Sequence, residues 1–400
     1  MVITLQVSKT LQAKIRKGCP WVFSYQLQNP GVTGSPGDLG VIYDSSKKFL
    51  AIGFYDPFSD LRLRILQTGA PVEIGEDFFR RRLAEAVKLR QSLELHGTTG
   101  YRVLHGENDG FPGLVLDRYE DTLVLKLYTI SWAPYLECLL GLIQEVLPVH
   151  RCVLRLSRNA RKPVETHTRL RDGQALLGAL PDSPVRFREN GLRFEADVLH
   201  GQKTGFFLDQ RENRQRVRTL SRDRSVLNVF SYTGGFSVYA LAGRCRSVLE
   251  IDSNPHALKA SLKNIRLNFQ DRIPGSSDWR QLHGDAFRLL DKLGGVGETF
   301  DMVLLDPPAF AGKKKQKARA VDAYRRLAAA GAGLVRPEGV LFAASCSVHV
   351  SPDDFFHAVL SGIHSAGKTG REFLRTGHSV DHPVSFQEGG YLKAIYLRIF

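Results

Sequence analysis

The chain has 400 residues, a formal net charge of +14 and an apolar fraction of 43%. This length exceeds what one compact core usually holds, so we expect two or three domains. No stretch approaches the roughly 20 apolar residues that a membrane span requires, and the first residues carry no apolar signal core, which predicts a cytoplasmic protein. The five scattered cysteines form no CxxC pair, which argues against a zinc site or a disulfide framework.

The excess of Lys and Arg points to a polyanionic partner, since basic side chains gain affinity by displacing phosphate counterions. The alternative is a solvated basic surface without a partner.

Residues 1–75 are rich in Gly, Pro and short apolar runs, which predicts a small all-β domain. The stretch LGVIYDSSKKFLAIGFYD, residues 39–56, has two apolar runs around an Asp-Ser-Ser turn, as a hairpin does. The stretch LRLRIL, residues 61–66, alternates with a period of two and would place Arg62 and Arg64 on the outer face.

Residues 76–185 change to an α+β pattern. Residues 77–95 have helical spacing with Asp77 as the expected N-cap, and a second helix is expected at residues 133–147. Residues 102–128 predict two or three strands, and CVLRLS, residues 152–157, predicts one more. The turn-rich residues 181–191 would carry the junction to the last domain.

In residues 186–400, apolar runs of strand length alternate with helical segments, which predicts a parallel α/β sheet with its ligands at the carboxyl ends of the strands. The runs are SVLNVFS (225–231), SVLEID (247–252), FDMVLLD (300–306) and VLFAASC (340–346).

Residues at the ends of these strands indicate a nucleotide-like cofactor. Gly234 and Gly235 follow the first strand and allow close backbone approach at a helix N-terminus. Asp252 ends the second strand, where a carboxylate can accept hydrogen bonds from both ribose hydroxyls, and Asp285 follows the next expected strand.

Two cofactors compete on these residues, a dinucleotide and S-adenosylmethionine (SAM). The G-x-G-x-x-G phosphate loop is missing, and SAM has no pyrophosphate to cradle, so the pattern favours SAM. The tetrapeptide DPPA, residues 306–309, follows the fourth strand and favours a methyltransferase, although Pro307 and Pro308 could simply stiffen a loop.

Motifs along nearly the whole chain carry a specific likeness: CPWVFS, DGFPGLVLDRY, HGQKTGFFLDQRENR, VLNVFSYTGGFSVYAL, DMVLLDPPAF, SCS and DHPVSFQEGGYLKAIYLRIF. With them the chain resembles the 23S ribosomal RNA cytosine-5 methyltransferase I family, bacterial class I SAM enzymes. The resemblance implies a PUA RNA-binding domain (1–75), a small central α+β domain (76–185) and a Rossmann-like methyltransferase domain (186–400). The chain departs from the family at Ala309, where lysine is frequent, at Cys19, where histidine is usual, and beyond Tyr324, where an asparagine is missing.

The resemblance also implies the residues around SAM, which are Phe207, Asp209, Arg211, Asn228, Phe230, Ser231, Tyr232, Gly234, Asp252, Asp285, Asp306 and Pro307. Lys203, Thr204 and Phe206 would close over the cofactor or order its pocket. The alternatives are core packing for Phe206 and Phe207 and a surface ion pair for Arg211.

Carbon 5 of cytosine is a poor nucleophile, and addition of a thiolate at carbon 6 activates it. Cys346 is the candidate thiolate because it ends a strand beside the DPPA strand, and Asp306 would hydrogen-bond the base. The alternative for Cys346 is a buried filler, which is common for a free cysteine; the other four cysteines fit core or turn positions better. His349 would be a proton carrier or a surface residue.

The expected partner is 23S rRNA or a large-subunit precursor, without membrane or metal; a homodimer stays open. Two other functions also stay open, namely methylation of guanine N7 or an exocyclic amine without the cysteine, and a non-catalytic SAM-binding assembly factor. The predicted RNA-binding residues are Lys14, Arg16, Lys17, Arg158, Arg161, Lys162, Lys313, Lys314 and Lys315.

Overall fold

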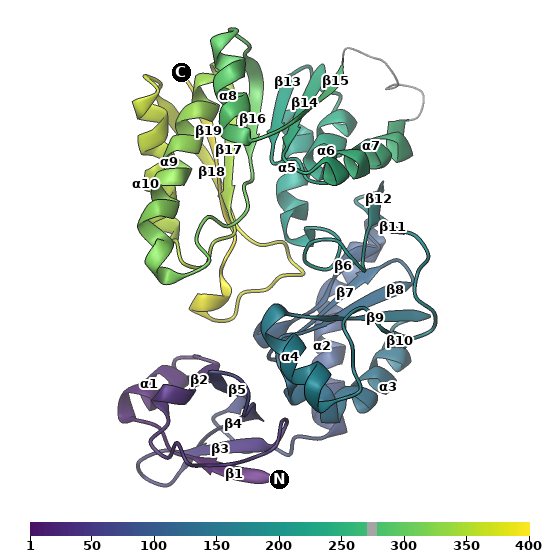
Figure 1. Cartoon of the computed structure of the whole chain (residues 1–400), viewed down its shortest axis with the longest axis vertical. Coiled ribbons are helices and arrows are strands. Elements are labelled where there is room, and N and C mark those ends of the chain that lie inside the picture. The colour runs from purple at the N-terminus through teal and green to yellow at the C-terminus, as the bar shows by residue number, and fades with distance from the viewer. Residues whose placement is uncertain (270–277) are drawn as a thin grey trace. The chain divides into compact units, whose positions relative to one another are not determined.

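The computed structural model describes residues 1–269 and 278–400, apart from the side chain of Lys314. Its elements are labelled in Figure 1. They form two compact units. The first comprises Met1–Gly191, Ala196–Leu208 and Val380–Gly389, and the second comprises Leu192–Glu195, Asp209–Ser379 and Gly390–Phe400. None of the helices within the described ranges is long and apolar enough to cross a bilayer.

The first unit begins with a five-stranded sheet in the order β1-β3-β4-β5-β2. Its strands are β1 (Val2–Leu5), β2 (Trp21–Phe23), β3 (Leu39–Tyr43), β4 (Phe49–Tyr55) and β5 (Leu61–Thr68). The predicted hairpin is confirmed, because β3 pairs antiparallel with β4. Asp44 closes its turn by accepting the backbone N–H groups of Ser46 and Lys48 at 2.8 and 3.0 Å.

The all-β expectation for this region is wrong, because α1 (Lys9–Arg16) precedes β2. Ser8 caps this helix by accepting the N–H of Leu11, and the helix buries Leu11 and Ile15. The outer-face expectation is also wrong for Arg64, whose side chain is 12% exposed and pairs with Glu107 at 2.6 Å. A single helix of eight residues with no acidic first turn leaves a weak sequence signal.

A second five-stranded sheet of the first unit has the order β10-β9-β8-β7-β6. The elements of this part are α2 (Glu76–Leu95), β6 (Gly100–His105), β7 (Leu114–Tyr119), β8 (Thr122–Leu127), α3 (Leu136–Val146), β9 (Arg151–Leu156), α4 (Arg158–His167), β10 (Ala175–Leu177) and β11 (Val185–Glu189). Gly75, not Asp77, is the N-cap of α2, so that prediction is wrong. The second predicted helix starts late, because a short 3-10 helix containing Pro134 precedes it.

One apolar core runs through the first unit. It joins Phe54 and Leu66 of the first sheet to Phe79, Phe111 and Trp132. The indole N–H of Trp132 is satisfied by donating to the carbonyl oxygen of Pro112 at 2.8 Å. The shared core explains why the first two sheets belong to one compact unit.

The second unit is built on a seven-stranded sheet in the order β15-β14-β13-β16-β17-β19-β18. Its strands are β13 (Ser225–Val229), β14 (Ser247–Asp252), β15 (Trp279–His283), β16 (Phe300–Leu305), β17 (Val335–Ser345), β18 (Gly370–Thr376) and β19 (Lys393–Ile399), and β12 (Leu192–Ala196) precedes them. The four predicted strands pair in parallel as expected. We did not predict the antiparallel edge, in which β19 pairs with β17 and β18.

Helices cover both faces of this sheet (Figure 1). Leu227 and Leu305 point to a core shared with α8 (Ala286–Gly295), α9 (Lys317–Gly333) and α10 (Pro352–Ser365). The neighbouring residues Val226 and Leu304 point to the opposite core, shared with α5 (Arg211–Leu220) and α6 (Gly235–Ala242). Burial on both faces explains why these strands read as continuous apolar runs. The α/β class of the prediction is confirmed.

Candidate active site

The carboxyl end of β13 opens into a loop with left-handed backbone at three residues. Phe230, Tyr232 and Gly234 have φ values of 62°, 48° and 76°. A Cβ atom at position 234 would lie 2.0 Å from the hydroxyl oxygen of Ser261, so the loop requires glycine at the point where α6 begins.

Two buried hydroxyl groups of the same loop have unused hydrogen-bonding capacity. Ser231 Oγ and Thr233 Oγ1 are buried and have no hydrogen-bond partner among the described residues. Buried polar groups are normally paired, and an unpaired one costs free energy. The loop therefore suits a polar ligand that reaches these hydroxyls.

Asp252 lies at the end of β14 beside this loop. Its two carboxylate oxygens accept the backbone N–H groups of Tyr232 and Asn254, each at 2.8 Å. These bonds fix the carboxylate and leave a lone pair on each oxygen, which suits a vicinal diol. Asn254 caps α7 (Pro255–Phe269) by accepting the N–H of His256 at 3.0 Å.

Glu250 lies two residues before Asp252, and sequence reasoning missed it. Its buried carboxylate accepts the hydroxyl of Ser261 at 2.7 Å and the amide of Gln281 at 2.7 Å. Burial raises the pKa of Glu250, against the effect of these hydrogen bonds. Because a Cβ at Gly234 would lie 3.0 Å from Glu250, this carboxylate forms the floor beneath the glycine loop.

Asp306 follows β16 and is oriented by two residues that we did not predict as site residues. Its Oδ1 accepts the side-chain amide of Gln210 at 2.9 Å, and the Gln210 carbonyl accepts the amide of Asn213 at 2.6 Å. Asn228 is buried within β13 and donates to Ser237 at 2.9 Å. Asp285 is exposed and caps α8 through the N–H of Arg288 at 3.0 Å.

Cys346 follows β17, the strand that pairs with β16, and its side chain is half-buried. The preceding residue, Ser345, donates to the hydroxyl of Tyr324 at 2.8 Å. Burial raises the pKa of Tyr324 to about 12, so this phenol stays protonated at neutral pH. The Tyr324 ring packs against Phe310, just beyond DPPA, with ring centroids 4.9 Å apart. His349 is exposed.

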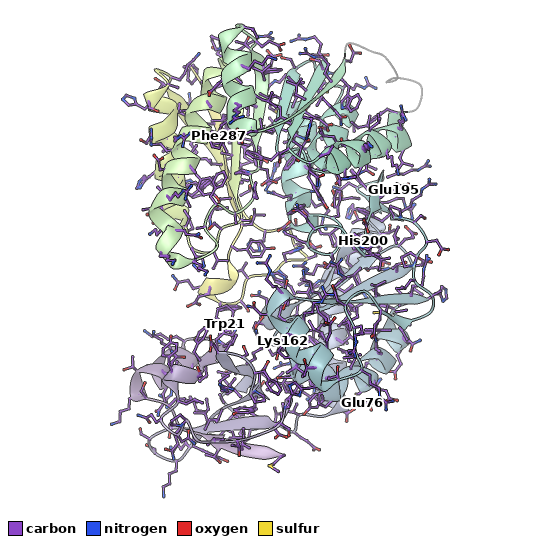
Figure 2. All side chains as sticks on the ribbon, viewed as in Figure 1. Trp21, Glu76, Lys162, Glu195, His200 and Phe287 are labelled. Carbon is purple, nitrogen blue, oxygen red and sulfur yellow. The ribbon has the colours of Figure 1, made fainter. Side chains whose placement is uncertain are left out.

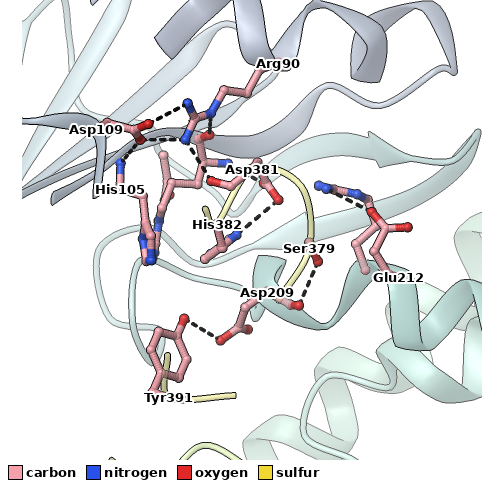
Figure 3. A network of polar contacts seen from close by, with 12 residues as sticks. Arg90, His105, Asp109, Asp209, Glu212, Ser379, Asp381, His382 and Tyr391 are labelled. Atoms are coloured by element: carbon pink, nitrogen blue, oxygen red, sulfur yellow. Dashed lines mark hydrogen bonds and ion pairs between the residues drawn. The ribbon is translucent and has the colours of Figure 1, made fainter. Parts of the chain in front are cut away.

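Asp209 and Arg211 are buried at the start of α5. Asp209 accepts the hydroxyl of Tyr391 at 2.9 Å through its carboxylate and that of Ser379 at 2.7 Å through its backbone oxygen (Figure 3). The guanidinium of Arg211 lies 3.3 Å from the carboxylate of Glu212. Because the Arg211 side chain is only 1% exposed, this ion pair is not confined to the surface.

The residues just before Asp209 belong to the first unit. Thr204 donates to Asp117 at 2.6 Å, and the ring of Phe206 packs against Phe187 with centroids 5.1 Å apart. Lys203 places its ammonium 4.5 Å from the centroid of the Phe207 ring. These contacts hold Thr204 and Phe206 within the first unit.

The predicted RNA-binding side chains that the structure describes are exposed. Figure 2 labels Lys162 on α4. Arg16 pairs with Asp44, and Arg161 pairs with Glu165. The side chain of Lys314 lies outside the described part. The exposed residues are Lys14, Arg16, Lys17, Arg158, Arg161, Lys162, Lys313 and Lys315.

A cleft of about 900 Å³ in the first unit contains one of these residues, Arg158, at the start of α4. Phe58 and Tyr128 also line it and are 45% and 43% exposed. Neither aromatic residue was predicted as a site residue. Exposed rings beside a cation suit stacking of unpaired bases.

Comparison with known proteins decides the family. Residues 127–365 match the model described as S-adenosylmethionine-dependent methyltransferase. The chain belongs to this family. Residues 5–68 match a PUA-like domain. The methyltransferase is 45% identical to "Ribosomal RNA large subunit methyltransferase" of Deinococcus radiodurans, over 99% of this chain and 97% of that protein. It is 34% identical to "Ribosomal RNA large subunit methyltransferase I" of Pseudoalteromonas translucida, over 96% of each chain.

A solved structure of a methyltransferase in complex with S-adenosylhomocysteine (SAH) is similar in fold, with a TM-score of 0.83. The two chains are 20% identical, and the match covers 99% of this chain and 100% of the other. The predicted family and cofactor, SAM, are thus confirmed. The residues of the loop after β13 fit SAM, because the glycine cradle, the two unpaired hydroxyls and Asp252 offer what a nucleoside with a charged tail needs. Across the described residues, no His, Cys, Asp and Glu side chains gather into a group that could hold a metal ion.

Proposed function

We propose that this methyltransferase acts on 23S rRNA or its large-subunit precursor and methylates carbon 5 of a cytosine through a covalent adduct with Cys346. The relatives reported above are named as ribosomal RNA large subunit methyltransferases, which supports the RNA class. The observation that carries the choice of atom is that Cys346 directly follows β17, the parallel neighbour of β16, which Asp306 directly follows. Methyl transfer to a nitrogen atom of a base would need no thiol at that place.

In the proposed reaction the Cys346 sulfur adds to carbon 6 of the ring, and carbon 5 gains the electron density to attack an electrophilic methyl group. Bound SAM supplies that methyl group. A base then removes the proton from carbon 5, and the bond between sulfur and carbon 6 breaks, which restores the aromatic ring and the thiolate. Asp306, oriented by Gln210, would hydrogen-bond the polar edge of the cytosine.

Around SAM we propose Asn228, Phe230, Ser231, Tyr232, Gly234, Asp252, Asp285, Asp306 and Pro307, with Phe207, Asp209 and Arg211 from the preceding segment. Asp252 would bind the ribose hydroxyls, and Ser231 would contact the cofactor through its buried hydroxyl. These roles predict weaker SAM binding on Asp252→Ala, measured by calorimetry, while Asp322→Ala, exposed on α9, serves as the control.

The deciding experiment replaces Cys346 by Ala and measures transfer of labelled methyl from SAM to large-subunit RNA from cells that lack the protein. We expect turnover to be lost while SAM binding is kept. Cys245→Ala is the matched control, because Cys245 lies before β14, on the side of the sheet away from the strand carboxyl ends. Full turnover of Cys346→Ala would exclude the covalent route and favour guanine N7 or an exocyclic amine.

A wild-type protein that binds SAM but methylates no RNA in this assay would indicate an assembly factor instead. Mapping the labelled nucleotide in the wild-type reaction then identifies the base and the atom.

A further inference from the structure

The second unit buries a lysine side chain beside the turn that follows Cys346. Lys393, the first residue of β19, is 4% exposed. Its ammonium donates to the backbone oxygens of Ser347 at 2.5 Å, Val350 at 2.7 Å and Tyr391 at 3.2 Å. These acceptors use all three donors of the ammonium but carry no net charge. Within the described residues, no carboxylate forms an ion pair with this ammonium.

Strand pairing places Lys393 beside the end of β17, which the candidate nucleophile directly follows. Lys393 is the direct partner of Ser345 in the antiparallel pair of β17 and β19, so the two side chains lie on one face of the sheet. Ser347 and Val350 both accept from Lys393; Ser347 directly follows Cys346 in the chain, and Val350 lies in the same turn. The lysine thus fixes the turn that carries the thiol.

The electrostatics of the pair agree with this geometry. Burial lowers the pKa of Lys393 to about 8, and the negative charge of a Cys346 thiolate acts in the opposite direction. A buried cation is costly unless an anion accompanies it. The other titratable groups here are Tyr324 on α9, which is acted on by both Cys346 and Asp306, and Asp306 itself after β16.

We propose that Lys393 is a positioning residue of the methyl-transfer reaction: its ammonium holds the turn after β17 and stabilises the thiolate form of Cys346. This inference rests on the proposed role of Cys346. The thiol proton passes to solvent before RNA binds, the ammonium keeps its own proton, and the electron pair left on sulfur forms the bond to carbon 6. After elimination, the Lys393 ammonium again stabilises the Cys346 thiolate.

The test measures the pH dependence of iodoacetamide alkylation at Cys346 in the full-length protein, resolved by peptide mass spectrometry. Lys393→Met keeps the aliphatic volume and removes the charge, whereas Lys393→Arg keeps the charge. In Lys393→Met we expect the thiolate fraction of Cys346 at pH 7 to fall about tenfold, which corresponds to a shift of its titration by about one pH unit. In Lys393→Arg we expect most of the reactivity of Cys346 to be restored. Alkylation of Cys245, in the same samples, should not change.

An identical Cys346 profile in wild type and Lys393→Met would overturn the proposal, even if methyl transfer fell. Should Lys393→Met fail to fold, the reciprocal measurement replaces it: the pKa of Lys393, followed by nitrogen NMR, should fall in Cys346→Ala, because linkage is mutual. An unchanged lysine pKa would also overturn it. Neither measurement uses methyl transfer, so an active Cys346→Ala enzyme would refute the covalent route and leave the coupling itself measurable.

Discussion

At the scale of single residues, one absent side chain shapes the loop that follows β13. Gly234 lies over the hydrogen bond between Ser261 and Glu250. Its backbone is left-handed, a conformation that only glycine adopts without a steric penalty. A methyl group added here would clash with the Ser261 hydroxyl. Displacing that hydroxyl would also leave the buried Glu250 carboxylate with one hydrogen-bond donor fewer, which adds an electrostatic cost.

We expect Gly234→Ala to weaken SAM binding at least about tenfold and to lower the free energy of unfolding by about 1–3 kcal/mol. Calorimetric titration and urea unfolding measure the two effects. Gly295→Ala at the end of α8 is the control, because its Cβ would meet no atom within 4 Å. Unaltered SAM affinity in Gly234→Ala would show that the loop does not approach the cofactor.

At the scale of elements, a carboxylate ties together the amino ends of β13 and β16. Asp301 accepts the N–H and the hydroxyl of Ser225 at 2.8 and 2.9 Å, and it pairs with Arg336 at 3.0 Å. Burial alone would raise the pKa of Asp301, but the bonds from Ser225 and Arg336 outweigh it and hold that pKa below its usual value.

A lowered folded-state pKa means that the stabilisation is complete above the unfolded pKa of about 4 and is lost as the pH falls through the lower folded value. We expect Asp301→Asn to cost about 1–3 kcal/mol at pH 7, and this difference from wild type should shrink as the pH falls below 4. Urea unfolding over this range measures it, with the exposed Asp322→Asn as the charge-matched control. A cost that stays constant down to pH 3 would contradict the assignment.

A second element-scale prediction concerns the lysines after DPPAF. Reversing Lys313 and Lys315 to Glu should weaken RNA binding and reduce its salt dependence by about two phosphate contacts. Fluorescence anisotropy at several salt concentrations provides the slope. Lys263→Glu with Lys292→Glu, exposed on α7 and α8, makes the same charge change elsewhere. Equal losses in both double variants would mean that only net charge matters.

At the scale of the whole molecule, the chain passes repeatedly between its two units. The segment Val380–Gly389 belongs to the first unit, although the residues on both sides of it belong to the second. Asp381 anchors the segment: its carboxylate accepts the N–H of Arg102, and its backbone oxygen accepts from Arg90, each at 2.9 Å (Figure 3). Asn108 adds a third anchor by accepting the N–H of Ser385 at 2.8 Å.

Asp381→Ala should therefore destabilise the first unit, by about 2 kcal/mol, because it leaves a buried donor unpaired. Hydrogen exchange resolves the location: β6 should lose protection while β13 keeps it. Asp353→Ala, exposed at the start of α10, is the control. Faster exchange confined to the second unit would refute this anchoring role.

Sequence reasoning succeeded where the signal is local. The four parallel strands carry continuous apolar runs that end in polar residues, and the Asp-Ser-Ser turn closes a hairpin. It failed where the partner lies far along the chain. Arg64 turns inward to meet Glu107, and Gln210, Glu250 and Lys393 were not predicted as site residues, although Gln210 and Lys393 lie within quoted motifs. Their environment arises only when distant segments fold together, as does the pairing of β19 with β17.

The interleaving of the units has a consequence for synthesis. Domains generally fold in order as they leave the ribosome, amino-terminal first. Here the first unit starts at Met1, yet Asp381 must be translated before Arg90 and Arg102 can make all their contacts. The first unit therefore cannot complete its contacts until Val380–Gly389 has been translated. A nascent chain truncated before residue 380 would expose an incompletely paired first unit to chaperones and proteases.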